Sequence, residues 1–233
     1  MGKAAFRRGL GHGVPIALGY LSVAFAFGIQ AAGGGLTPLQ AVLISMTNLT
    51  SAGQVAGLSL MVAGAPLYEM ALTQLVINLR YALMSLSLSQ RLDAGMTTPW
   101  RALLAFGNTD EIFAVASSQP GEIGRAYLTG LICLPYVGWA GGTLLGAAAG
   151  ALLPALLTDA LGIAIYGMFL AVILPPARSR RSVRLVVVAA AVMSCILRYA
   201  PAFSSISGGF SIILCAVSAA ALGAWRFPVR EAE

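Results

Sequence analysis

The sequence has very little charge. Its 233 residues include 14 Lys and Arg and 8 Asp and Glu, so that only 9% are charged, whereas about a quarter are charged in soluble domains. Hydrophobic residues make up 58% of the chain, and the mean hydropathy is +0.85. This balance excludes an ordinary soluble domain and predicts an integral membrane protein.

Cysteine is also scarce. Cys133, Cys195 and Cys215 each lie inside an apolar run, and no two of them have the spacing of a disulfide framework or a metal site. We therefore expect reduced cysteines in the protein core, and no bound metal.

The motifs of common enzymes are absent too. The sequence contains no Gly-rich phosphate loop, no nucleophile elbow and no pair of metal ligands at helical spacing. We therefore expect no enzymatic activity and no cofactor. The net charge is +6, but the basic residues lie at the ends of apolar runs, where membrane orientation explains them better than nucleic-acid binding does.

Long apolar runs are the main feature of the sequence. They are continuous, unlike the segments of about 10 residues with alternating polarity in a membrane β-barrel, and most approach the ~20 residues of a spanning helix. The prediction is an all-α integral membrane protein, a polytopic helical bundle forming one transporter domain over residues 1–233. About eight transmembrane helices are expected, or seven if the fourth run, which contains "NTDEIF", does not cross. The runs are residues 14–32, 38–63, 67–89, 99–117, 123–145, 156–174, 183–200 and 209–225.

The basic residues favour eight spans with both termini in the cytoplasm. This topology places ten of the 14 basic residues inside, leaves Arg91, Arg101 and Arg198 toward the outside, and keeps Arg80 within a span. No internal repeat is evident. The residues expected inside are Lys3, Arg7, Arg8, Arg125, Arg178, Arg180, Arg181, Arg184, Arg226 and Arg230.

Small residues recur in "GGTLLGAAAG". Gly142, Gly146 and Gly150 are spaced by four and predict a face for close helix packing. Internal packing is the favoured interpretation, and a contact with another subunit or a moving bundle is the alternative.

The second run is unusually polar at its middle. In "MTNLTSAGQVAG", Thr47, Asn48, Ser51 and Gln54 crowd together. A broken helix whose freed backbone lines a binding site is one interpretation. An intact helix whose hydroxyls bond back to their own backbone is the other.

The third run, "QLVINLRYALMSLSLS", contains Asn78 and Arg80. Arginine stays charged, so Arg80 needs a carboxylate or carbonyl partner, with Asp110, Glu111 or Glu69 as candidates. A structural ion pair is favoured over the binding of a substrate carboxylate.

The segment "GNTDEIF" places Asp110 and Glu111 side by side. On a helix adjacent side chains point about 100° apart, so one carboxylate can pair with Arg80 while the other faces a cavity. That second carboxylate could exchange a proton or hold a substrate ammonium. Alternatively, the acidic pair marks only the start of a helix.

Three motifs together resemble the AzlC-like family, the large subunits of branched-chain amino acid exporters. They are "GYLSVAFAFGIQA" (19–31), "NLRYALMSLSLS" (78–89) and "TDEIFAV" (109–115). The sequence departs from the family pattern in two places. Ser22 stands where the family has proline, and "LTSAGQV" (49–55) keeps Gln54 but lacks the two flanking aromatics, which puts a branched-chain substrate in question.

The resemblance implies a secondary transporter that exports small amino acids, Leu, Val, Ile or Met, across a bacterial cytoplasmic membrane, coupled to the proton gradient. It also implies a small AzlD-like membrane subunit as a partner. A non-transporting scaffold subunit and a passive channel are the alternatives. The expected substrate-binding residues are Thr47, Asn48, Ser51, Gln54, Asn78, Asp110 and Glu111.

Overall fold

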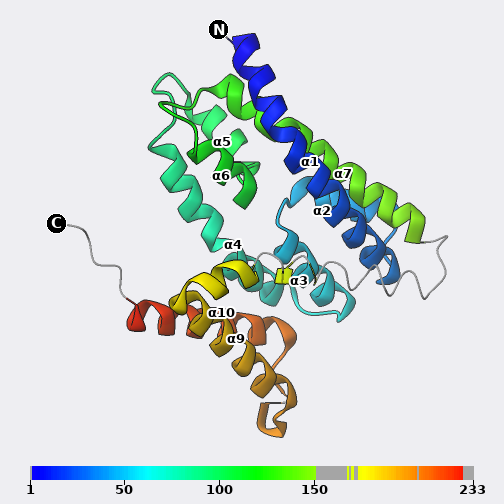
Figure 1. Ribbon diagram of the computed structural model, residues 1–233. Coiled ribbons are helices and arrows are strands. Elements are labelled where there is room, and N and C mark those ends of the chain that lie inside the picture. The colour runs from blue at the N-terminus through cyan, green and yellow to red at the C-terminus, as the bar shows by residue number, and fades with distance from the viewer. Residues whose placement is uncertain (1, 151–166, 168, 171–172, 204, 228–233) are drawn as a thin grey trace. The chain divides into compact units, whose positions relative to one another are not determined.

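The computed structural model of the chain describes residues 2–150, 167, 169–170, 173–203 and 205–227 (Figure 1). Within these residues the secondary structure is helical, with one isolated bridge between Leu92 and Ile123. The predicted all-α membrane protein is confirmed. The chain divides into two compact units, Met1–Val55 with Asn78–Ile165 (unit 1) and Ala56–Ile77 with Tyr166–Glu233 (unit 2). One transporter domain over residues 1–233 stays a prediction.

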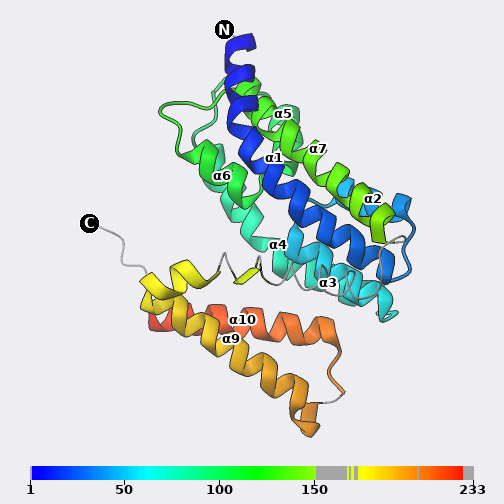
Figure 2. The ribbon, with the colours of Figure 1, turned by 45° about the vertical axis from the view of Figure 1, so that its right-hand side comes forward.

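Two long parallel helices form the scaffold of unit 1. Helices α1 (Gly2–Gly33) and α7 (Arg125–Gly150) lie side by side in both ribbon views (Figures 1 and 2). Gly13 of α1 lies against Leu131, and further along both helices Gly28 lies against Ala147. Both helices therefore begin at one end of unit 1, which we call its amino end, and finish at the other, its carboxyl end.

The predicted small-residue face of α7 packs against α1. A methyl group added at Gly142 would lie 3.0 Å from both Ala24 Cβ and Leu21 Cα, and one added at Gly150 would lie 3.3 Å from Ala32 Cβ. Gly146 is packed against the backbone of Phe25 in the same way. The interpretation as internal packing is confirmed, and because this face is covered inside the chain it is not a surface for another subunit.

The second apolar run, expected as one span over residues 38–63, is broken. Helix α2 (Pro38–Thr47) starts with a capping box between Thr37 and Gln40. Thr47 Oγ1 bonds back to Leu43 O, and Asn48 leaves the helix with φ −144°, while its Oδ1 accepts a hydrogen bond from Thr50 Oγ1. These local bonds compete with the helical ladder, and α3 (Ser51–Val62) begins immediately afterwards.

Helices α2 and α3 form a hairpin rather than a kinked span. Gln54 Nε2 donates to Ser45 Oγ at 2.8 Å. In one straight helix these residues would lie about 13.5 Å apart along the axis and on opposite faces. The chain therefore turns back at residues 48–50. Ser45 bonds Thr143 and the Tyr136 hydroxyl donates to Met46 O, so this first hairpin rises along α7 from the carboxyl end.

The fourth run, expected as a span over residues 99–117, is also a hairpin. Helix α5 (Thr98–Phe106) ends at Gly107, where an added methyl would clash with Ile132 of α7. Helix α6 (Asp110–Ser117) then returns, because Arg91 donates to the carbonyl oxygens of Ser117 and Gln119. One straight helix over these residues would separate its ends by about 28 Å.

This second hairpin enters from the amino end of unit 1. Asp93 N donates to Ile123 O at 3.1 Å, and the Arg125 guanidinium lies 4.8 Å above the Trp100 ring. Gly2 and Gly95 line one pocket at the same end. The two hairpins thus enter unit 1 from opposite ends, an inverted arrangement of the kind found in transporters.

The broken segments correct the expected topology. Arg91 and Arg101, predicted to lie opposite the N-terminus, lie at the amino end with it, since the α5–α6 hairpin does not cross unit 1. The expected span 156–174 falls mainly outside the described residues. Five described helices are long and apolar enough to cross a membrane, so the count of eight is not confirmed. They are α1, α4 (Leu67–Ser89), α7, α9 (Arg181–Tyr199) and α10 (Gly208–Arg226).

Helices α9 and α10 of unit 2 lie side by side in both ribbon views (Figures 1 and 2). Their bounds lie close to the expected runs 183–200 and 209–225, and those of α4 match the run 67–89. Cys133 and Cys195 are exposed on the helix surface and Cys215 is half-buried, so the prediction of core cysteines is wrong. An apolar side chain in a membrane helix can face lipid as readily as the protein interior.

Glu69 has a structural position in unit 2. Its side chain is buried, and Oε1 accepts hydrogen bonds from Ser207 Oγ at 2.6 Å and from the Gly209 amide at 2.8 Å. A carboxylate at the start of α10 satisfies amide groups that the helix itself leaves free. Glu69 is therefore not the partner of Arg80.

Replacing Glu69 with alanine is expected to lower the melting temperature of the purified protein by about 5 °C or more. The change removes two charge-assisted hydrogen bonds, each worth about 1.5–3 kcal/mol, and 1 kcal/mol corresponds to about 2–4 °C in a chain of this size. Thermal unfolding in detergent measures the shift. Glu122→Ala, at an exposed loop residue, is the control, and equal melting temperatures for both variants would contradict the capping role.

Candidate functional site

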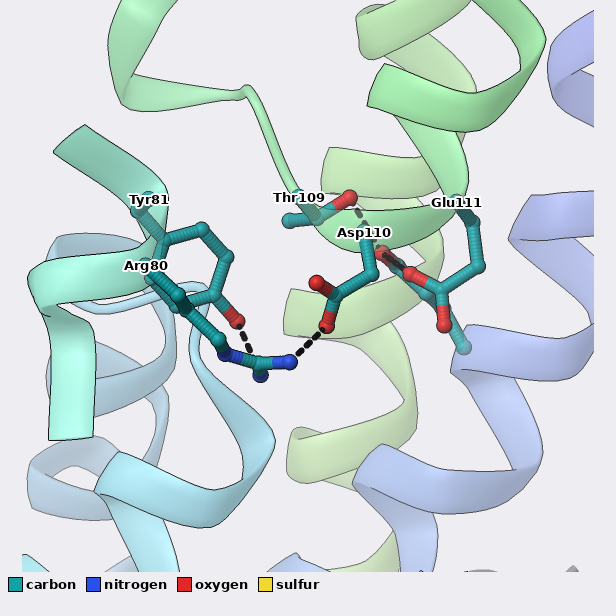
Figure 3. A network of polar contacts seen from close by, with 6 residues as sticks. Arg80, Tyr81, Thr109, Asp110 and Glu111 are labelled. Carbon is teal, nitrogen blue, oxygen red and sulfur yellow. Dashed lines mark hydrogen bonds and ion pairs between the residues drawn. The ribbon is translucent and has the colours of Figure 1, made fainter. Parts of the chain in front are cut away.

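Charged and phenolic side chains meet at the tip of the second hairpin. We call Tyr20, Arg80, Tyr81, Thr109, Asp110 and Glu111 the charged centre. Arg80 and Tyr81 come from α4, while Asp110 and Glu111 open α6 (Figure 3). Segments that are far apart in sequence therefore supply one site inside unit 1.

Arg80 forms the ion pair that the sequence predicted. Its Nη1 lies 2.6 Å from Asp110 Oδ2, and its Nη2 donates to the Tyr81 hydroxyl at 3.1 Å (Figure 3). The guanidinium carbon also lies 4.8 Å from the centre of the Tyr81 ring. The two charged side chains are 48% and 43% exposed. The ion pair is therefore partly exposed at the protein surface and not sealed in the core.

Glu111 faces a different neighbour. The Tyr20 hydroxyl donates to Glu111 Oε2 at 2.6 Å, and its oxygen lies 2.5 Å from Thr109 Oγ1. Both carboxylates occupy the first turn of α6, where the helix dipole stabilises negative charge. With one arginine and two carboxylates, the centre carries a net charge of −1 when both acids are ionised.

Gln54 belongs to a separate, buried network. Only 1% of its surface is exposed; its amide nitrogen donates to Ser45, and its amide oxygen accepts from Trp139 Nε1 at 2.9 Å. Ser45 in turn lies 2.6 Å from Thr143 Oγ1. These bonds fasten the first hairpin to α7, and they occupy both ends of the Gln54 amide.

The rings of Tyr20 and Trp139 connect the two groups. They meet edge to face with centroids 5.0 Å apart, and Leu49, at the turn of the first hairpin, belongs to the same buried cluster. Tyr20 thus shares a buried cluster with the turn of the first hairpin, and its hydroxyl donates to the tip of the second.

The remaining predicted site residues lie on or beside three helices. Thr47 and Asn48 end α2, Ser51 begins α3, and Asn78 lies on α4 two positions before Arg80. The Thr47 hydroxyl bonds its own helix, as one of the two interpretations held. Of the predicted set, the structure joins Arg80 and Asp110 in an ion pair, while Glu111, next to Asp110 in the sequence, accepts from Tyr20 instead.

Tyr20, Trp139 and Asn108 were not among the predicted site residues. Signals for them existed: Tyr20 lies in the first quoted motif, a buried indole usually needs an acceptor, and Asn108 precedes the acidic pair. None of these signals names the partner, which depends on how the hairpins fold back.

Two broken apolar runs and a charged centre, in a chain with several membrane-length helices, define a multi-pass membrane protein with a polar site among its helices. The chain belongs to the AzlC protein family, whose sequence profile matches residues 15–153. This range includes both hairpins and every residue of the charged centre.

Individual relatives cover most of the chain. It is 32% identical over 189 residues to the inner membrane protein YgaZ of Escherichia coli K12, covering 78% of this chain and 77% of that protein. It is 33% identical over 180 residues to an uncharacterized membrane protein of Archaeoglobus fulgidus, covering 76% and 78% respectively. No solved structure matches the chain.

Proposed function

We propose that this protein is a secondary transporter that exports small apolar amino acids, Leu, Val, Ile or Met, across the cytoplasmic membrane in exchange for protons. The observation that carries the proposal is the charged centre at the tip of the second hairpin, where Tyr20 links it to the buried cluster that contains the turn of the first. Transporters use such discontinuous helices for solute sites near the middle of the membrane.

The chemistry of the charged centre supports an ammonium-bearing solute and a proton. Charged groups within a membrane are costly and usually serve a pathway. Arg80 offsets one carboxylate and leaves one net negative charge. A solute ammonium or a proton on Glu111 neutralises that charge, which gives a simple means of coupling solute release to proton entry.

The roles proposed for the predicted residues follow from their contacts. Asp110 and Glu111 accept the ammonium or the proton, and Arg80 holds Asp110 in place. The donors for a solute carboxylate are Asn48, Ser51 and Asn78, beside the hairpin turn and on α4, because the Thr47 hydroxyl already donates to Leu43 O. Gln54 instead holds the first hairpin on α7.

The orientation follows from the basic residues of the amino end. Six basic residues gather at this end. By the positive-inside rule, this end and the N-terminus therefore face the cytoplasm. The carboxyl-end turn after α1, residues 34–37, carries none. The six are Lys3, Arg7, Arg8, Arg91, Arg101 and Arg125.

A small multi-span membrane subunit of the AzlD type is proposed as the partner. Such a subunit needs an outward apolar face, and α4 carries one. Its leucines at positions 75, 79, 83 and 86 are all more than half exposed and recur at helical spacing. The α7 glycine face, in contrast, is covered by α1.

Amino acid efflux tests the proposal. Cells lacking their own exporters are loaded with dipeptides of leucine, valine, isoleucine and methionine, and release is followed with this chain alone and with its candidate partner. We expect partner-dependent efflux that falls at least about tenfold in Glu111→Gln, because the neutral amide cannot take up a proton.

Glu122→Gln, the same change at an exposed loop residue, is the matched control and should retain the original rate. Efflux that ignores the proton gradient would indicate a channel. No efflux of any of the four amino acids, from protein shown to be inserted and paired, would overturn the proposed substrate class.

A further inference from the structure

A groove of about 260 Å³ lies among helices α4, α5, α6 and α7 of unit 1. Eight of its twelve lining residues are Leu, Ile or Ala, so its wall is mainly aliphatic. Ala102 and Ala105 of α5 belong to this lining and are exposed, so the groove opens at the protein surface. On a surface embedded in a membrane, the solvent at such an opening is lipid hydrocarbon.

The groove runs along the helices. On α4 its lining includes Ser85, Leu88 and Ser89, a spacing that follows one helix face over a full turn. Its inner end lies at the tip of the second hairpin, where Asn108 Nδ2 donates to Ser85 Oγ at 3.0 Å. Its outer end lies at the amino end of unit 1, at Arg101. Because lipid chains also extend inward from headgroups at the interface, the groove has the direction that a lipid chain needs.

Arg101 places a positive charge at the outer end of the groove. The single salt bridge of the described residues joins Arg80 and Asp110, so Arg101 is bound to no carboxylate there, and none of the described lining residues is acidic. At the same end the Arg125 guanidinium lies over the Trp100 ring, and tryptophan is typical of the membrane–water interface. Arg101 therefore lies at the depth of lipid headgroups, where a guanidinium can bind a phosphate through two parallel hydrogen bonds.

We propose that this groove binds one acyl chain of an anionic phospholipid, whose headgroup phosphate pairs with Arg101. Basic pockets between membrane helices on the cytoplasmic side recognise anionic headgroups, and the six basic residues of the amino end place the groove on that side. A methylene is about as large as a water, which fills about 30 Å³, so the groove has room for about nine methylenes of one chain.

A lipid in this groove braces the second hairpin. Leu104 of α5 and Ile112 of α6 both line the groove, so a bound chain contacts both arms of the hairpin. Leu88 of α4 and Leu128 of α7 lie in the same lining and give the chain its other walls. Ile112 is also the neighbour of Glu111 in the charged centre. The lipid thus supports the element that carries the two carboxylates.

Photolabelling of the full chain in phosphatidylcholine nanodiscs tests the site. A trace of phosphatidylglycerol with a diazirine on one acyl chain is activated, and labelled peptides are mapped by mass spectrometry. We expect labels on the groove segments of α4, α5 and α6. Phosphatidylcholine with the same diazirine chain should label them about fivefold less, and Arg101→Gln should lower the phosphatidylglycerol labels by a similar factor, the contribution of one basic residue near an anionic lipid surface.

Arg7→Gln removes a charge from an exposed residue of the same end outside the groove, and should label as the original protein does. Ala105→Trp fills the groove and should lower labelling by either lipid at least about tenfold, whereas Ala82→Trp, at an exposed position of α4 outside it, should not. Size-exclusion chromatography checks that each variant folds. Equal labelling by the two lipids, or an equal loss in Arg7→Gln and Arg101→Gln, would overturn the headgroup site. Labels that Ala105→Trp leaves unchanged would overturn the groove as the site of the chain.

Discussion

Gly142→Val is expected to prevent accumulation of folded protein in the membrane, while Gly141→Val is expected to have little effect. A side chain at Gly142 would run into the Leu21 backbone and Ala24 of α1, whereas one at Gly141 would meet nothing within 4 Å. The two glycines are neighbours on α7, so helix propensity changes almost equally, but Gly142 is buried against α1 and Gly141 is partly exposed. Only the close contact between α1 and α7 distinguishes them.

The measurement is the amount of monodisperse protein extracted from membranes, with the melting temperature of whatever remains. We expect a loss of at least about tenfold for Gly142→Val, because backbone atoms cannot move aside as a flexible side chain can. A stable, extractable Gly142→Val protein would show that α1 and α7 do not pack in parallel through their glycines. If Gly141→Val lowered the yield of monodisperse protein as much, the cause would be the low helix propensity of valine and not the contact with α1.

The long apolar elements could be predicted because a bilayer imposes their length. The run 67–89 coincides with α4, and 183–200 lies within two residues of α9. For α1 the expected run covered only part of the helix, since the segment before Val14 contains Lys3, Arg7 and Arg8 and is not apolar. Helical structure extends through it all the same, because Gly9 and Gly13 pack on α7.

Hydropathy alone does not predict the two hairpins. The turn at residues 48–50 contains no proline or glycine, and it follows from side chains that bond locally at Thr47 and Asn48. Hydropathy measures whether a segment is apolar, not whether it crosses or returns. A hairpin that was counted as a span adds one membrane crossing that does not exist. Every loop after it is then assigned to the wrong side of the membrane, and the first hairpin misplaced Arg91 and Arg101 in this way.

The ion pair of Arg80 could be predicted from the sequence, whereas the hydrogen bonds of Gln54 could not. Arg80 keeps its charge in any environment, so a carboxylate partner had to exist and few were available in the sequence. A glutamine can be satisfied by almost any polar neighbour. Its bonds to Ser45 and Trp139 depend on the first hairpin folding back along α7, which only the tertiary structure defines.

Exchanging the charges of the central pair is expected to separate folding from transport. Arg80→Asp or Asp110→Arg alone should lower both the yield of folded protein and efflux at least about tenfold, because each puts two like charges in contact. The double variant restores opposite charges at the same two positions. If the pair mainly positions the hairpin, we expect both yield and efflux to recover at least a third of their original values.

The readouts are the yield of monodisperse protein and the initial rate of amino acid efflux per inserted molecule. Tyr81→Phe removes only the hydroxyl that accepts from Arg80 and serves as a mild control, expected to change efflux about twofold or less. Recovered yield without recovered efflux would mean that Arg80 itself binds the solute carboxylate. A double variant no better than either single one would contradict the ion pair, since a pair defined by opposite charge tolerates their exchange far better than the loss of one.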